Sequence, residues 1–227
     1  MSFTVDVRCL RFRYGGGPWV LDIPELSLEW GTRAFLFGPS GSGKTTLLGV
    51  LAGVLEATEG EIRVLGEDLA SLSGARRDAF RAEHIGYVFQ MFNLIPYLSV
   101  LDNIALPVRM HAGRRARLDG KGVKETAALL AEHLQIGNLL DNQVTELSVG
   151  QQQRVAACRA LIGAPELIVA DEPTSSLDFD RREAFLDLLF HECERAGATL
   201  VFVSHDRTLE GKFSRTISLP DINKALR

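Results

Sequence analysis

Residues 38–45 constrain the fold of this chain more than any other feature. Their sequence, GPSGSGKT, fits the pattern G-x-x-x-x-G-K-[ST] at every fixed position. The segment stands between a short apolar run, RAFLFG, and a helical pattern, TTLLGVLAG. Glycines let the backbone bend so that successive N–H groups point inward at a phosphate. The motif in this strand–loop–helix setting therefore predicts nucleotide binding.

The side chains of this loop have separate expected roles. Lys44 is expected to reach the β- and γ-phosphates of a nucleotide, and the hydroxyl of Thr45 to bind Mg²⁺. A chance glycine-rich turn is the alternative, and it would not require the strand and the helix that flank the loop. The residues predicted to bind ATP in this segment are Gly38, Ser40, Gly41, Ser42, Gly43, Lys44, Thr45 and Thr46.

The first strand pattern of the chain is antiparallel in character. Residues 3–9 alternate, which places Phe3, Val5, Val7 and Cys9 on one face of a half-buried strand. Two more strand patterns, LSLEW and EIRVLG, follow nearby in the sequence. An N-terminal antiparallel β subdomain is therefore predicted.

The rest of the chain predicts an α/β core. The apolar strands ELIVADE and TLVFVSHD are separated by a long helical pattern, which indicates parallel pairing. A mostly helical insertion, from about residue 91 to residue 164, interrupts this core, and Ser99 with Asp102 resembles a capped helix start. The predicted fold class is a P-loop NTPase core with a mostly parallel sheet and a helical subdomain insertion, in a single domain of residues 1–227.

Bulk composition excludes some classes of function. A net charge of −4 over 227 residues gives no sign of a nucleic-acid-binding surface. The basic run at residues 111–124 fits a solvated loop, with contact to acidic lipid headgroups as the alternative. Three cysteines without metal-ligand spacing fit a reducing compartment. With no signal-peptide pattern and no apolar run of ~18 residues, the sequence predicts a cytoplasmic protein whose membrane role needs a partner.

A pair of acids follows the apolar strand LIVA. In a parallel sheet beside the phosphate loop, Asp171 is expected to hold Mg²⁺, directly or through water. Glu172 is expected to position and polarise the water that attacks the γ-phosphate. A surface acid pair at a strand end is the alternative, and the long apolar run before the acids argues against it.

The stretch LSVGQQQRVA, residues 147–156, reads as a glycine-bearing turn that leads into a helix. Free N–H groups at a helix start carry partial positive charge and suit an anion. The chain therefore carries a second candidate anion site in addition to its phosphate loop.

Four motifs occur in a fixed order: the phosphate loop, LSVGQQQRVA, LIVADEPTSSLD and VSHD. In that order they resemble the ATP-binding-cassette (ABC) ATPases over essentially the whole chain. Ordinary P-loop kinases and GTPases have no counterpart of the signature stretch, so the motif set is specific. Residues 87–107, YVFQMFNLIPYLSVLDNIALP, are similar to the ATPase subunits that serve lipoprotein release, macrolide-type efflux and the cell-division permease complex.

The resemblance implies roles for further residues. Tyr14 stands where the family has an aromatic residue stacked on adenine, although the sequence alone fits a packing residue equally well. Gln90 matches the glutamine that senses Mg²⁺ and the γ-phosphate, and residues 91–97 would line the socket for the coupling helix of a membrane partner. Asp178 matches the acid of the loop that crosses the dimer interface. His205 matches the switch histidine that contacts the γ-phosphate.

The resemblance also implies why the chain has two anion sites. In this family two ATPase domains pack head to tail, and the signature of one closes over the ATP held by the other. Ser148 would then hydrogen-bond the γ-phosphate of the partner's ATP, and the Gly150 N–H with the helix N-terminus would stabilise its charge. Val149 and Gln151 are the other residues of this turn that would contact the partner's ATP. Val149 replaces the usual glycine, so either its φ is already negative and its side chain points away, or closure is weakened. Complete sites require a second copy of the chain or a close homologue.

Three functions fit these implications. The first is the ATPase subunit of a transporter that exports or extracts a lipoprotein, peptide or hydrophobic compound, peripheral on the cytoplasmic face of the (inner) membrane through its permease. The alternative is a mechanical signalling ATPase of a cell-division-type complex that transports no substrate. The third is an ABC ATPase without a membrane partner, against which the segment after Gln90 argues. ATP and Mg²⁺ are the expected cofactors, and no nucleic acid is expected as a partner.

Overall fold

The computed structural model describes residues 3–118, 120–175 and 177–226. The chain forms two compact units. Unit 1 consists of Met1–Arg81 and Thr199–Arg227, and unit 2 consists of Ala82–Ala198.

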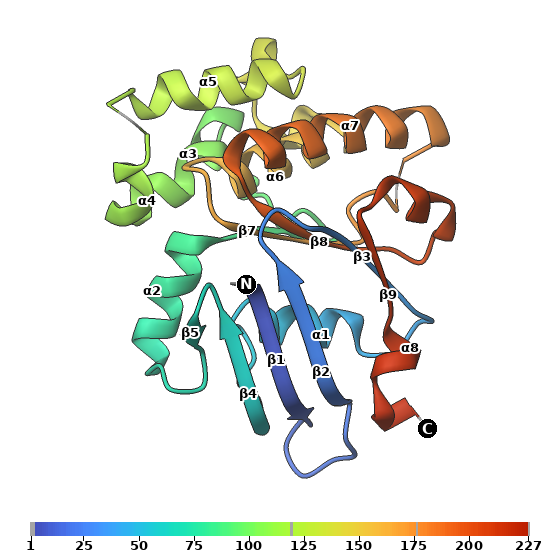
Figure 1. Ribbon diagram of the computed structural model, residues 1–227. Helices are drawn as coiled ribbons and strands as arrows, with labels where there is room; N and C mark the ends of the chain where they lie inside the picture. The colour runs from blue at the N-terminus through green and yellow to red at the C-terminus, as the bar shows by residue number, and fades with distance from the viewer. Residues whose placement is uncertain (1–2, 119, 176, 227) are drawn as a thin grey trace. The chain divides into compact units, whose positions relative to one another are not determined.

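An antiparallel sheet forms the first part of unit 1, with the strand order β2-β1-β4-β5 (Figure 1). Val5, Val7 and Leu10 of its central strand β1 have no exposed surface, so this strand supplies apolar core. The predicted antiparallel N-terminal part is confirmed. The strands are β1 (Phe3–Phe12), β2 (Leu21–Glu29), β4 (Glu59–Val64) and β5 (Glu67–Asp68).

Cys9 does not share the buried face, contrary to the alternation expected from the sequence. Its side chain is exposed, and its φ of 49° lies in the left-handed region. The pairing of β1 with β4 shifts between Arg8 and Arg11, so the irregularity at Cys9 turns Leu10 into the core. Gly60 faces it so closely that a Cβ there would lie 2.3 Å from the Cys9 carbonyl oxygen.

The second part of unit 1 consists of parallel strands. β3 (Arg33–Phe37) pairs in parallel with β8 (Thr199–Val203) and with β9 (Arg215–Ser218). All residues of β8 are buried, as expected for an apolar run in a parallel sheet. The helix α1 (Lys44–Leu51) follows β3 after the phosphate loop and buries nearly every residue.

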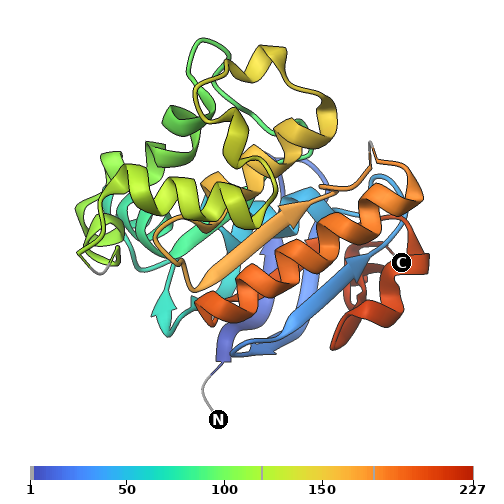
Figure 2. The same cartoon turned by 90° about the horizontal axis from the view of Figure 1, so that it is seen from above.

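Unit 2 holds a parallel strand pair and the larger helices. β6 (Ile85–Val88) pairs in parallel with β7 (Leu167–Asp171), and α7 runs alongside β7 in the view from above (Figure 2). The helix α3 packs against α5 and α6, and α6 packs against α7. The helices are α3 (Val100–Met110), α4 (Ala112–Ala116), α5 (Val123–His133), α6 (Val149–Leu161) and α7 (Phe179–Ala196).

The predicted fold class is confirmed: the chain is α/β, with parallel strands, an antiparallel N-terminal sheet and helices. The expected cap of α3 is also present, because the Ser99 hydroxyl accepts from the Asp102 N–H at 3.1 Å. The helix α2 (Gly74–His84) was not expected, since it buries none of its residues and shows no apolar stripe. No helix among the described residues is long and apolar enough to cross a membrane.

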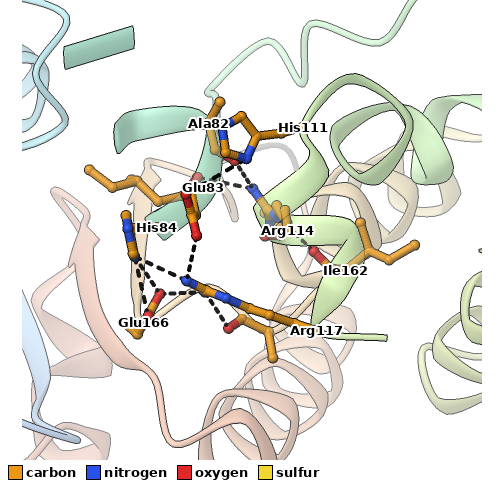
Figure 3. Close-up of polar contacts among 11 residues, drawn as sticks. Ala82, Glu83, His84, His111, Arg114, Arg117, Ile162 and Glu166 are labelled. Carbon is orange, nitrogen blue, oxygen red and sulfur yellow. Dashed lines mark hydrogen bonds and ion pairs between the residues drawn. The ribbon is translucent and has the colours of Figure 1, made fainter. Parts of the chain in front are cut away.

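A buried arginine fastens α4 within unit 2 (Figure 3). Arg114 is 3% exposed, its Nε donates to the Ile162 carbonyl at 2.7 Å, and its Nη1 donates to the Ile85 carbonyl at 3.2 Å. Its Nη2 donates to the Ala160 carbonyl. The last carbonyls of a helix have no donor within the helix itself. Arg114 of α4 supplies hydrogen-bond donors to the carbonyls at the end of α6. Burial lowers the pKa of Arg114 to about 10, which still leaves the guanidinium charged at neutral pH.

Replacing Arg114 with methionine is expected to lower the free energy of unfolding by at least about 3 kcal/mol. A buried acceptor left without a partner costs about 1–3 kcal/mol, and this variant removes the donor from four carbonyls, three of which it binds in buried hydrogen bonds. For a chain of this length the loss corresponds to a fall in Tm of roughly 6–12 °C. Thermal unfolding followed by circular dichroism measures the effect.

Arg115→Met is the matched control for this experiment. Arg115 is exposed and donates to the Val108 and Arg109 carbonyls, so its replacement is expected to cost under about 1 kcal/mol. Equal losses of Tm in the two variants would contradict the role given to Arg114.

Candidate active site

The phosphate loop of unit 1 begins where β3 ends and runs into α1. Gly41 and Gly43 have φ values of 78° and 95°, which the left-handed region allows for glycine without steric cost. A Cβ on Gly43 would lie 2.9 Å from the Leu21 side chain and 3.2 Å from the Val20 carbonyl oxygen. Conformation and space therefore both require glycine at position 43.

Lys44 lies inside the curve of this loop. Its side chain is mostly buried, and its Nζ donates to the Gly38 carbonyl at 2.8 Å and to the Pro39 carbonyl at 3.0 Å. An ammonium group has three donors, so these two bonds leave one for a ligand. The loop carbonyls thus fix a positive charge at the position where the sequence predicts phosphate contact.

Two further features of the loop fit a phosphate group. The Ser42 hydroxyl is buried and has no hydrogen-bond partner among the described residues. The helix α1 starts at Gly43 without a side-chain cap, so its first N–H groups keep their donor capacity. A buried hydroxyl without a partner and a helix N-terminus without a side-chain cap, both in one loop, suit the phosphate group that the sequence predicts there.

Tyr14 lies beside the start of α1. Its hydroxyl is 3.3 Å from Thr46 Oγ1, and its ring packs edge-on against Phe12 at 4.8 Å between centroids. The Tyr14 side chain remains 57% exposed, so most of the ring is available for stacking. The structure therefore brings Tyr14 to the phosphate loop, while its contact with adenine stays a prediction.

His205 reaches the same edge of the parallel strands as the phosphate loop. β3 and β8 pair in parallel, with Leu36 opposite Val203, so their carboxyl ends lie together. Gly38 lies two positions after Leu36, and His205 lies two positions after Val203. The His205 side chain is exposed. Functional residues in open α/β sheets gather at this edge.

The acid pair of unit 2 ends β7. Asp171 is buried. The pKa of Tyr87 is raised by the burial of its own hydroxyl and, to a lesser extent, by the negative charge of Asp171. Glu172 has a φ of 45°, a left-handed conformation that is uncommon for a residue with a side chain. Backbone strain of this kind concentrates at functional sites, and no sequence pattern indicated it.

Gln90 lies at the same edge as these acids. β6 and β7 pair in parallel, with Val88 opposite Ala170, so Gln90 and Asp171 both follow the paired residues at the carboxyl ends. The Gln90 side chain is exposed, while Asp171 is buried. Unit 2 thus places an amide and a carboxylate at the carboxyl ends of two neighbouring strands, and their joint contact with Mg²⁺ stays a prediction.

The signature stretch forms the start of α6. The Ser148 hydroxyl accepts from the Gln151 N–H at 3.4 Å, and the Gln151 side chain accepts from the Ser148 N–H at 2.9 Å, which makes a capping box. Val149 is the first helical residue, so its φ is negative, and its side chain is 49% exposed. The negative φ that the first alternative requires is present, while the direction of the Val149 side chain relative to the partner's ATP and its effect on closure stay predictions.

Asp178 caps the next helix in unit 2. Its carboxylate accepts from the Arg181 N–H at 3.0 Å and pairs with the Arg181 guanidinium at 3.3 Å, at an exposed helix start. Ser176, in the same predicted interface loop, lies outside the described residues. A position at the dimer interface remains a prediction for Asp178.

The glycine loop between β3 and α1 in unit 1 and, separately, the acid pair at the end of β7 in unit 2 are each typical of a P-loop nucleotide-binding ATPase of the α/β class. The sequence matches the family model of the ABC transporter over residues 21–175. The chain belongs to this ABC transporter family, and it binds ATP and hydrolyses it to ADP and phosphate.

Relatives from several bacteria agree with this assignment. The uncharacterized ABC transporter ATP-binding protein YbbA of Escherichia coli K12 is 38% identical over 95% of this chain and 93% of its own length. The lipoprotein-releasing system ATP-binding protein LolD 2 of Rhodospirillum rubrum is 37% identical over 96% and 94%. The macrolide export ATP-binding/permease protein MacB of Rhodopirellula baltica is 39% identical over 86% of this chain, which spans 28% of that longer protein.

A solved structure shares the fold. The dimeric, post-hydrolysis state of the ATP-binding cassette MJ0796, bound to ADP and Pi, superposes with a TM-score of 0.84 at 31% identity. The alignment covers 98% of this chain and 95% of that one.

Proposed function

We propose that this chain is the nucleotide-binding subunit of a membrane transporter and works as a head-to-tail dimer, with itself or with a close homologue. The whole chain acts as one ABC ATPase domain, with residues 91–164 as its helical part. The observation that carries the proposal is the exposed, capped start of α6. It offers a second candidate anion site in a sequence with one phosphate loop motif, which suits an ATP held by another copy. The dimers formed by the solved neighbours support the arrangement.

In this dimer the two anion sites complement each other. The phosphate loop holds ATP through its N–H groups and Lys44, and Tyr14 stacks on the adenine. The signature of the partner copy covers the γ-phosphate, with Ser148 donating its hydroxyl proton, since the bond to Gln151 uses that oxygen as an acceptor. Asp178 lies at the interface between the copies.

Hydrolysis in this proposal depends on residues after the strands. Glu172 accepts a proton from the attacking water while the water oxygen bonds to the γ-phosphorus and the bond to the bridging β–γ oxygen breaks. His205 donates to a γ-phosphate oxygen as negative charge grows there. ADP and inorganic phosphate are the products.

Thr45, Gln90 and Asp171 fit the proposed Mg²⁺. They offer a hydroxyl, an amide oxygen and a buried carboxylate, which are the oxygen ligands that this ion prefers. Bound Mg²⁺ supplies positive charge that neutralises the β- and γ-phosphate oxygens. The chain's own part is to hold these three oxygen-bearing groups at the ends of strands and at the start of α1.

The segment after Gln90 is the proposed contact with the permease. Met91 and Tyr97 are 80% and 78% exposed, whereas Phe92 between them is buried. Two large exposed apolar side chains on one short, anchored segment suit a protein interface. This contact would hold the chain at the cytoplasmic face of a membrane, and the names of the LolD and MacB relatives favour a lipoprotein or a hydrophobic compound as cargo.

Ser148→Arg tests the head-to-tail arrangement in a Glu172→Gln background, which keeps ATP bound. With ATP and Mg²⁺, light scattering is expected to show the 24.9 kDa chain doubling its mass. The arginine at position 148 is expected to abolish this doubling because its bulk occupies the space of the partner's γ-phosphate. Binding of a fluorescent ATP analogue to the phosphate loop should persist.

Ser71→Arg is the control for this test, since it makes the same change at an exposed serine outside every motif. It is expected to leave the doubling intact. A Ser148→Arg chain that dimerises like its parent would refute the head-to-tail arrangement.

A further inference from the structure

One arginine of the signature helix holds the segment proposed to face the permease. Arg159 of α6 donates from Nη1 to the Asn93 carbonyl at 2.7 Å and from Nη2 to the Phe92 carbonyl at 2.5 Å. The planar guanidinium thus bridges two successive carbonyls, which a single ammonium group does not do in the same way.

The two carbonyls belong to a strained turn. Phe92 and Asn93 have φ values of 59° and 49°, both in the left-handed region. Successive residues with side chains adopt this conformation only where the surroundings hold them. The Phe92 side chain is buried, and burial also lowers the pKa of Arg159, so the bridge lies in a partly desolvated place where charge-assisted bonds are strong.

The other end of the segment is held from α3. The buried Asn103 side chain accepts from the Ile95 N–H at 2.8 Å and donates to the Ile95 carbonyl at 3.1 Å. Exposed Met91 and Tyr97 therefore sit on a segment with two anchors, one of which is the signature helix itself.

The C-terminal end of α6 is fixed to its neighbours. Arg114 binds the Ile162 carbonyl (Figure 3) and the Ala160 carbonyl. β6 approaches so closely that a Cβ on Gly86 would lie 2.2 Å from the Ala160 carbonyl oxygen. One continuous helix connects this fixed end with the signature. Ser148 at its start and Arg159 are separated by roughly 16 Å along the helix axis.

We infer that Arg159 is a positioning residue that couples the segment of residues 91–98 to the signature of the same chain. A displacement of the segment by its partner is carried through the guanidinium to α6 and to Ser148, and ATP-driven closure at Ser148 is carried back. This inference rests on the proposed function for the meaning of both ends, while the bridge itself is independent of it.

Hydrogen exchange with mass spectrometry on residues 91–98 tests the bridge without nucleotide. Arg159→Lys keeps the positive charge but loses the planar guanidinium that binds two carbonyls at once. The rate of amide hydrogen exchange in this segment is therefore expected to rise at least about tenfold. Arg154→Lys is the matched control, because Arg154 lies on the same helix and donates instead to the Leu134 carbonyl at 3.2 Å. The control is expected to leave exchange in the segment within about twofold of the parent.

The same measurement with ATP and Mg²⁺, in the Glu172→Gln background, tests the coupling. In the parent, ATP is expected to slow exchange both at the start of α6 and in residues 91–98. In Arg159→Lys the protection of α6 should remain and that of the segment should disappear, a separation that general destabilisation does not produce.

Three outcomes decide the matter. Unchanged exchange of the segment in Arg159→Lys without nucleotide overturns the bridge. An ATP response of the segment that survives Arg159→Lys overturns the coupling. A Glu172→Gln parent that fails to dimerise with ATP counts against the proposed function, and the measurement without nucleotide then still decides on the bridge.

Discussion

Replacing Glu172 with glutamine is expected to lower the rate of ATP hydrolysis by about 10²–10⁴-fold while ATP still binds. Glutamine keeps the shape of the side chain and cannot accept the proton of the attacking water, and general base catalysis contributes a factor of this size. Glutamate and glutamine have the same Cβ and Cγ and meet the same steric cost at this left-handed backbone, so the loss belongs to the carboxylate. Phosphate release at saturating ATP and Mg²⁺ measures the rate.

Glu125→Gln provides the control for this measurement, because Glu125 is an exposed acid in the first turn of α5. Its activity is expected to match that of the parent. Hydrolysis by Glu172→Gln within a factor of two of the parent would rule out the base role of Glu172.

Replacing Lys44 with alanine is expected to weaken ATP binding by about 10- to 150-fold. The ammonium group makes a charge-assisted contact with phosphate, worth roughly 1.5–3 kcal/mol, which converts to this range of affinity. The variant also loses the two bonds by which Nζ ties the Gly38 and Pro39 carbonyls together, so the shape of the loop is less fixed. Titration with a fluorescent ATP analogue measures the affinity.

Lys124→Ala is the matched control, since Lys124 is exposed on α5. Affinity should stay unchanged in that variant. If Lys44→Ala binds the analogue as tightly as the parent does, the loop is not the main anchor of the nucleotide.

The sequence by itself determined the features whose physics is local. The phosphate loop depends on glycines whose backbone conformation is decided within a few residues, as Gly41 and Gly43 show. The parallel strand before Asp171 follows from an unbroken apolar run, and the start of α3 from a serine and an acid three positions apart. Because such signals need only neighbouring residues, order and spacing were enough to predict the fold class and the family.

Other features were decided by partners far away in the chain. Cys9 leaves the predicted face at an irregularity in the pairing of β1 with β4, where Gly60 lies close to its carbonyl, and Val149 has a helical φ because α6 begins there. Arg159 and Phe92 are 67 residues apart, and Arg114 and Ile162 are 48 apart. From the sequence alone, these arginines look like ordinary helix residues, because the carbonyls that they bind come from distant parts of the chain. Only the tertiary structure could show which backbone groups each guanidinium satisfies, because burial, and not sequence spacing, makes an unpaired carbonyl costly.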